Sequence, residues 1–129
     1  MDVEQLLRRA WAARDQAYAP YSHFAVGAAL LGESGEVYVG CNVENVSYGL
    51  TICAERCAVT QAVAKGERQF RMIAIVSDSK APVSPCGACR QVLAEFTPSL
   101  PVVCENRTGE RFTASLAELL PRAKTGILD

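Results

Sequence analysis

The sequence lacks the features that would assign it to membranes or to nucleic acids. No apolar run is long enough to cross a bilayer, and the first five residues lack the basic start of a signal peptide. Thirteen basic residues stand against fourteen acidic ones, so no basic field is available to hold a phosphate backbone. We therefore expect a cytoplasmic protein that binds neither membranes nor long nucleic acids.

Internal repeats, low-complexity tracts and linkers are also missing. The chain has 129 residues, half of them hydrophobic, which suits a single core. It contains one histidine, His23, and six cysteines. Because thiols stay free in a reducing compartment, the cysteines favour metal binding over disulfides. We expect one domain that covers residues 1–129.

Hydrophobic periodicity predicts a mixture of helices and strands. A helical stripe runs from Val3 to Ala17 and ends before Pro20. The apolar runs 25–31 and 36–41 flank a glycine-containing turn and predict a hairpin. Further helices are expected over 53–64, over 86–96 and from 115 to about 121, and further strands over 72–76, 101–104 and 111–113.

This order of elements predicts an α/β protein with three layers, α/β/α, on a mixed sheet of about five strands. The run 72–76 is apolar throughout, which is typical of a central strand covered on both faces. Parallel strands joined through a helix make right-handed crossovers, so the helices beginning near Cys53 and Cys86 should start at the same end of the sheet. Their first residues should therefore lie close together.

Three cysteines at these two helix starts have the spacing of metal ligands. Cys86 and Cys89 are separated by two residues, and Cys53 begins the other helix. Three thiolates occupy three corners of a tetrahedron and leave the fourth to water, as in a catalytic metal site. Soft sulfur ligands favour zinc over magnesium or calcium, with iron as the alternative. One ion per chain is expected.

Two charged residues follow Cys53 closely. Three thiolates on a divalent ion carry a net negative charge, which weakens the acidification of a bound water. Helix N-termini and Arg56, which can donate to a ligand sulfur, supply compensating positive charge. Glu55 lies two residues beyond a ligand, where a carboxyl can manage the proton of an activated water. The sequence thus predicts a catalytic Glu55 with Arg56 supporting the metal.

Cys57 supports an alternative interpretation. It lies one helical turn beyond Cys53, and a fourth thiolate there would close the site and make the zinc structural. A zinc-stabilised binding module is therefore the non-enzymatic alternative. A structural site has no use for Glu55 at its spacing, which favours catalysis. Cys41 and Cys104 lie in apolar strand contexts and are expected to be buried thiols.

Cys53-Ala54-Glu55 and Pro85-Cys86-Gly87-Ala88-Cys89 resemble the H-x-E and P-C-x-x-C signature of zinc-dependent nucleobase deaminases, with cysteine replacing histidine. The all-cysteine form is similar to the small homotetrameric cytidine deaminases. Several separated motifs in the right order are more specific than one C-x-x-C pair. The likeness covers nearly the whole chain and includes Ala17-Tyr18-Ala19-Pro20-Tyr21-Ser22, Gly40-Cys41-Asn42-Val43-Glu44-Asn45 and Ser84 to Gln91.

The resemblance implies an activity and a set of roles. Family members hydrolyse cytidine and deoxycytidine to uridine and deoxyuridine with release of ammonia, in pyrimidine salvage. Water activated at zinc attacks C4 of the pyrimidine, while Glu55 protonates N3 and later the departing amine. By the same resemblance, Asn42 and Glu44 bind ribose hydroxyls. Phe24 packs against the nucleoside, and the backbone of Ala54 helps to read the base.

The resemblance also implies an assembly. The expected homotetramer places its active sites near subunit interfaces, with Tyr48 lining the site of a neighbouring subunit. Many relatives carry an aromatic residue a few positions after Pro121, whereas this chain continues with residues 122–125, Arg-Ala-Lys-Thr. The enzymatic alternative is a deaminase of another aminopyrimidine nucleoside, of the blasticidin type. Asn42 and Glu44 favour a ribose-containing substrate.

Overall fold

The computed structural model describes residues 1–123, so the second half of the segment 122–125 that follows Pro121 lies outside the described residues. No helix in residues 1–123 is long and apolar enough to span a membrane. The elements of this part of the chain are α1 Val3–Arg14, β1 Val26–Gly32, β2 Val37–Cys41, the 3-10 helix η1 Tyr48–Leu50, α2 Ala54–Ala64, β3 Phe70–Ser77, α3 Gly87–Phe96, β4 Pro101–Asn106, β5 Arg111–Ser115 and α4 Leu116–Leu119.

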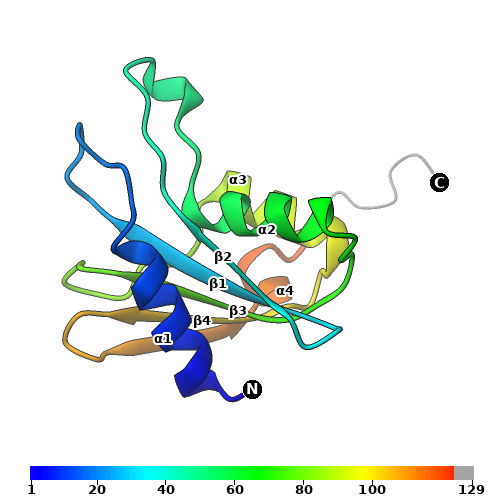
Figure 1. The fold of residues 1–129 in the computed structure, drawn as a ribbon. Helices are drawn as coiled ribbons and strands as arrows, with labels where there is room; N and C mark the ends of the chain where they lie inside the picture. The colour runs from blue at the N-terminus through cyan, green and yellow to red at the C-terminus, as the bar shows by residue number, and fades with distance from the viewer. Residues whose placement is uncertain (124–129) are drawn as a thin grey trace.

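The five strands form one mixed sheet in the order β2-β1-β3-β4-β5 (Figure 1). β1 runs antiparallel to β2 and β3, β3 runs parallel to β4, and β4 runs antiparallel to β5. Ala74 of β3 pairs with Ala29 of β1 on one side and with Val103 of β4 on the other. The apolar run around Met72–Val76 therefore forms the central strand, as its composition predicts.

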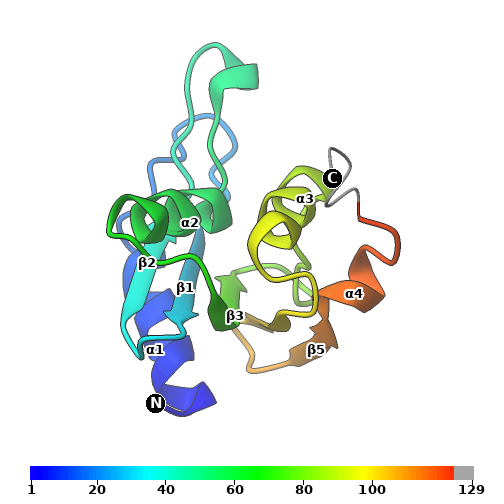
Figure 2. The ribbon, with the colours of Figure 1, turned by 90° about the vertical axis from the view of Figure 1, so that its right-hand side faces the viewer.

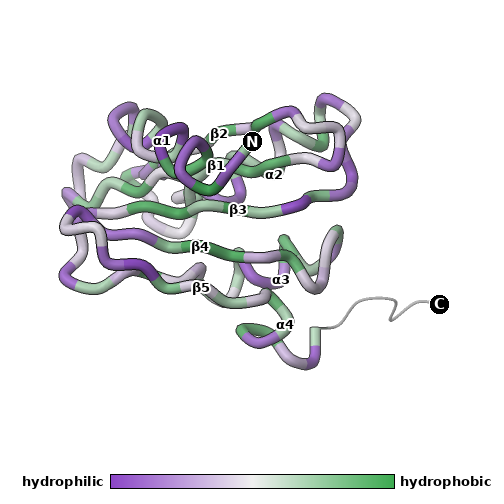
Figure 3. The backbone as a smooth tube through the Cα atoms, turned by 90° about the horizontal axis from the view of Figure 1, so that it is seen from below, coloured by the Kyte–Doolittle hydropathy of each residue, from purple (hydrophilic) through white to green (hydrophobic). Residues whose placement is uncertain are grey.

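Side chains alternate along the strands between two cores on opposite faces of the sheet, because successive strand residues point to opposite sides. On one face, Ala29 and Val76 pack against α1. On the other, Leu30 and Ile75 pack against α2, α3 and α4. Figure 2 shows α2 and α3 side by side, and Figure 3 shows hydrophobic residues along the central strands. The expected three-layer architecture with a five-stranded mixed sheet is confirmed.

Helix α1 ends earlier than its apolar stripe predicts. It begins at an Asp2 cap, where Asp2 accepts from the Gln5 N–H at 2.8 Å and the Gln5 side chain accepts from the Asp2 N–H. It ends at Arg14, whereas the stripe extends to Ala17. The reason is tertiary, since the N–H of Tyr18 donates to a backbone carbonyl beyond β2 at 3.0 Å. That pairing draws the chain out of helical geometry.

Helices α2 and α3 both begin at ligand cysteines. Cys53 is the N-cap of α2, and Cys86 is the N-cap of α3. Gly40 of β2 lets α2 approach the sheet closely, because a Cβ at this position would lie 2.3 Å from the carbonyl oxygen of Ala54. The absent side chain thus sets the position of the first turn of α2.

A long arm, defined as residues 42–53, projects from the body of the molecule between β2 and α2 (Figures 1 and 2). Its two sides are joined by backbone hydrogen bonds between Val43 and Ile52, of 2.9 and 3.0 Å. Its tip is η1, which the sequence pattern does not predict. Val46, Tyr48 and Leu50 are 81%, 59% and 66% exposed, so the arm presents apolar surface outside the two cores.

Candidate active site

Three sulfur atoms converge where α2 and α3 begin. The Sγ atoms of Cys53, Cys86 and Cys89 all lie within 4.8 Å of one another. Cys89 is fully buried in the first turn of α3, and its N–H donates to Cys86 Sγ at 3.5 Å. The first turns of the two helices direct their unpaired N–H groups and partial positive charge toward this end. The structure thus brings together the three cysteines that the sequence nominates as ligands.

The donor set fits zinc. A tetrahedral zinc with bonds of about 2.3 Å places its sulfur ligands about 3.8 Å apart, and the three sulfurs here lie within 4.8 Å of one another. Contact with the Cys89 thiol, together with the Arg56 guanidinium, lowers the pKa of Cys53 to about 5. The same contact and burial raise the pKa of Cys89. Three thiolates so close together repel one another, and a divalent cation neutralises that repulsion.

Arg56 lies beside this cluster. Its Nη2 donates to Cys53 Sγ at 3.4 Å, and the sulfurs around it raise the pKa of the guanidinium further above its usual range. The group therefore stays charged at every accessible pH. A cation donating to a ligand sulfur withdraws charge from it, which offsets the excess negative charge of three thiolates. The structure thus shows Arg56 in contact with one of the nominated ligand sulfurs, and its supporting role stays a prediction.

Glu55 is a buried carboxyl next to the sulfur cluster. Only 5% of the residue is exposed, and this burial raises the pKa of Glu55 to about 7. A carboxyl with that pKa exchanges protons readily near neutrality, as a general acid and base must. It projects from the first turn of α2, two residues beyond the Cys53 cap.

A cavity of about 260 Å³ opens beside these groups. Its wall includes Cys53, Cys86 and Glu55, so both the sulfur cluster and the carboxyl are reached from it. All five residues nominated as substrate contacts also line it, namely Phe24, Asn42, Glu44, Tyr48 and Ala54. Tyr48, expected in a neighbouring subunit's site, lines the cavity of its own chain here. Arg56 and Cys89 lie behind the wall.

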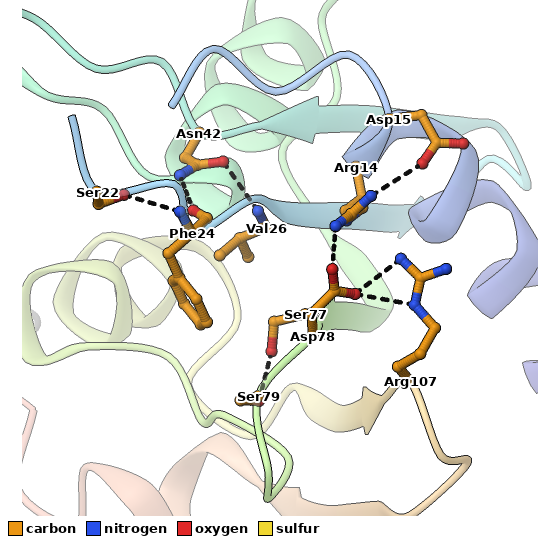
Figure 4. A network of polar contacts seen from close by, with 10 residues as sticks. All are labelled: Arg14, Asp15, Ser22, Phe24, Val26, Asn42, Ser77, Asp78, Ser79 and Arg107. Atoms are coloured by element: carbon orange, nitrogen blue, oxygen red, sulfur yellow. Dashed lines mark hydrogen bonds and ion pairs between the residues drawn. The ribbon is translucent and has the colours of Figure 1, made fainter. Parts of the chain in front are cut away.

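Asn42 and Glu44 follow β2 directly and are both buried, at 8% and 5% exposure. Asn42 accepts from the Val26 N–H at 2.9 Å and donates to the Phe24 carbonyl oxygen at 2.7 Å (Figure 4). Hydrogen bonds from the Ser22 hydroxyl and backbone lower the pKa of Glu44, so it is an ionised acceptor at neutral pH. Both side chains thus hold the loop that carries Phe24.

The remaining cysteines lie apart from the sulfur cluster. Cys57 is half-buried and faces the strand, since its Cβ would lie 2.9 Å from a Cβ placed on Gly40. The geometry therefore gives no support to a closed site with four thiolates. Cys104 is buried as expected, and Cys41 is only partly buried because it ends the edge strand β2.

Sequence reasoning misses several residues that the cavity needs. Ser22 and Ser84 belong to segments that match the family motifs, so those motifs could have identified them. Thr51 precedes α2, and Ile75 lies on the central strand, where nothing in the sequence distinguishes it from other core residues. The residues of the wall that were not nominated are Ser22, Val26, Thr51, Ile75, Val83 and Ser84.

Arg90 is a further residue without a predicted role. Its guanidinium donates to the Pro85 carbonyl oxygen at 2.7 Å, to Ser84 Oγ at 3.2 Å and to the Leu119 carbonyl oxygen at 3.0 Å. A cation in the first turn of a helix opposes the helix dipole, so these three bonds offset an unfavourable location. They tie the segment that carries Cys86 to α4.

Comparison of the sequence with known proteins points to one family. Residues 1–105 match the family described as the cytidine and deoxycytidylate deaminase zinc-binding region. The chain is 54% identical to a cytidine deaminase of Sporosarcina psychrophila over 95% of this chain and 91% of that protein. A cytidine deaminase of Halalkalibacterium halodurans is 51% identical over 97% and 96% of the two chains.

Solved structures agree with the sequence comparison. The crystal structure of cytidine deaminase from Burkholderia pseudomallei superposes with a TM-score of 0.92 at 51% identity, covering 95% of this chain and 99% of the other. That from Mycobacterium tuberculosis superposes with a TM-score of 0.83 at 42% identity, covering 96% and 98%. Together with the three-cysteine cluster, these matches confirm the family and the zinc cofactor expected from the motifs. The chain belongs to the zinc-dependent cytidine and deoxycytidylate deaminase family.

Proposed function

We propose that the protein hydrolyses cytidine and deoxycytidine to uridine and deoxyuridine with release of ammonia. One observation carries the proposal: the buried carboxyl of Glu55 and the sulfur cluster face the same cavity. A structural zinc site needs neither a cavity nor a proton carrier. The relatives that match almost the full chain bear the name cytidine deaminase.

Zinc held by Cys53, Cys86 and Cys89 supplies Lewis acidity, which lowers the pKa of a water molecule to roughly 7. Glu55 moves the protons. It accepts one from the water that attacks C4 and delivers it to N3 of the pyrimidine. It then takes the second proton from the new hydroxyl and passes it to the amine, which leaves as ammonia. A pKa near 7 suits both directions of transfer.

The cavity wall supports the orientation of a nucleoside. In this proposal Asn42 and Glu44, which line the cavity, bind ribose hydroxyls, and the Phe24 ring packs against the nucleoside. Because α2 begins at Ala54, the N–H of this residue has no intrahelical acceptor and is free to donate to the base. Arg56 keeps the charge of the sulfur cluster in balance while these groups hold the substrate.

Direct assay tests this function. Purified protein with its zinc quantified should lower the ultraviolet absorbance of cytidine and of deoxycytidine, with one ammonia released per turnover and a kcat of roughly 1 to 1000 per second. Blasticidin S is assayed in parallel. Turnover of blasticidin S alone would replace the substrate assignment, and no turnover at one zinc per chain would favour the zinc-stabilised binding module.

We also propose that the protein is a homotetramer with its sites near subunit interfaces. The arm supports this, because Val46, Tyr48 and Leu50 expose apolar surface next to the cavity wall that Tyr48 helps to form. A second copy that covers the arm would remove this surface from water. Sedimentation equilibrium should give four times the 13.9 kDa mass of the chain, and a monomer at micromolar concentration would contradict the proposal.

The proposal extends to one domain over residues 1–129 that acts in pyrimidine salvage in the cytoplasm. All six cysteines lie within the described residues and are free, which fits a reducing compartment. Recovery of the deaminase activity outside the cytosolic fraction would contradict this location.

A further inference from the structure

Glu44 has little hydrogen-bonding capacity left once the loop before β1 is in place. Its Oε1 accepts from the N–H groups of Tyr21 at 3.0 Å and Ser22 at 3.1 Å, and its Oε2 accepts from the Ser22 hydroxyl. A carboxylate oxygen accepts about two hydrogen bonds. Oε1 is therefore saturated, and Oε2 keeps one acceptor position. The hydrogen bond from the Ser22 hydroxyl to Oε2 determines the direction in which the remaining acceptor position points.

Ser22 also forms a hydrogen bond with Phe24, two residues further along the chain. Its Oγ accepts from the Phe24 N–H at 3.0 Å (Figure 4), while its own proton is donated to Glu44. The two bonds together fix the rotation of the hydroxyl. Phe24 is in turn bonded through its carbonyl oxygen to Asn42. A continuous chain of hydrogen bonds thus runs from Glu44 through Ser22 and Phe24 to Asn42.

The backbone between Ser22 and Phe24 needs this restraint. His23 has a φ of 57°, a left-handed conformation that residues other than glycine seldom adopt. Such a conformation persists only where surrounding contacts hold it. The bonds that do so are the His23 N–H to the Ala19 carbonyl oxygen, at 3.0 Å, and the Ser22 contacts on either side.

We propose that Ser22 is a positioning residue for sugar recognition: its hydroxyl orients Glu44 so that one acceptor position stays open to a sugar hydroxyl. The inference rests on the proposed function, because it requires a nucleoside in the cavity. Ser22 does not touch the reacting atoms, and it acts through Glu44. Its loss should weaken binding of a nucleoside that carries 2′- and 3′-hydroxyls more than binding of one that lacks them.

Kinetics of Ser22→Ala test the proposal. The KM for cytidine should rise about tenfold with a kcat within about twofold of the parent, as for a lost hydrogen bond to a charged group that acts in binding. The inhibition constant of 2′,3′-dideoxycytidine, which lacks the 2′- and 3′-hydroxyls and keeps the 5′-hydroxyl, should change at least about fivefold less than that KM. Ser22→Cys keeps the size and removes the strong donor, so it gives the same test if the alanine variant does not fold.

Ser34 offers a matched control at the other end of the sheet. Its hydroxyl donates to the Glu67 carboxylate and accepts from the Glu36 N–H at 3.3 Å, which repeats the pattern of Ser22 away from the cavity. Ser34→Ala should leave both constants at the parent values. Equal changes of the two constants in Ser22→Ala, or no change, would overturn the inference while the proposed function stands. Absence of cytidine turnover by the parent would overturn both.

Discussion

Glu55→Gln should lower kcat for cytidine by at least about a hundredfold to ten-thousandfold, the usual range for one general acid-base group. The loss should reach or exceed the upper end, because this carboxyl serves more than one proton transfer. Glutamine has nearly the same shape, so it fits the site where Glu55 is 5% exposed. It has no proton to exchange near neutrality, in contrast to a carboxyl whose pKa lies at about 7.

The measurement is the rate of absorbance loss with cytidine at a verified zinc content. Zinc should remain at one per chain, since Glu55 is not one of the three sulfur ligands. Glu95→Gln, on the exposed side of α3, is the matched control and should keep the parent rate. Near-normal turnover by Glu55→Gln would show that the proton carrier lies elsewhere, even with the substrate assigned correctly.

Cys89→Ala should abolish both zinc binding and turnover. Cys89 is fully buried and contributes one of three sulfurs, so alanine leaves two thiolates without the third corner of the site. The loss of zinc affinity should exceed the roughly 10- to 100-fold that follows removal of a residue that only supports a ligand. Zinc content after dialysis against a chelator, together with the cytidine rate, measures the effect.

Cys57→Ala is the control for this experiment. Its thiol lies on the same helix as Cys53 but faces Gly40, outside the cluster of three sulfurs. It should keep one zinc per chain and the parent rate. Parallel loss of zinc and activity in Cys57→Ala would instead indicate four thiolates on one ion and would overturn the open catalytic site.

The parts of the site that the sequence predicts are local. The spacing of Cys86 and Cys89 places both at the start of one helix. Glu55 lies two residues beyond Cys53, an interval that does not depend on the tertiary fold. Strand composition likewise predicts a buried central strand, because only a strand covered on both faces tolerates the apolar run that became β3. Local pattern is weaker at element ends, as the early end of α1 shows.

The cavity wall depends on contacts between distant residues and is therefore less predictable. Ser22 and Glu44 are 22 positions apart and meet only when the loop before β1 folds against the end of β2. Ile75 resembles any other strand residue, yet it lines the cavity. Arg90 reaches Leu119 across 29 positions. No periodicity encodes such contacts, because they follow from how helices and loops pack on the sheet.

The sequence by itself determined the chemistry of this protein: soft thiolates at metal-ligand spacing, a carboxyl two residues from one of them, and motifs that identify the family. These depend on residue types and short intervals, which folding does not alter. Only the tertiary structure brings the sulfurs of the three nominated cysteines within 4.8 Å of one another, with α2 packed closely over Gly40 on the same sheet face as α3. Tertiary contacts also left Glu44 one open acceptor, since its other positions are filled by a loop remote in sequence.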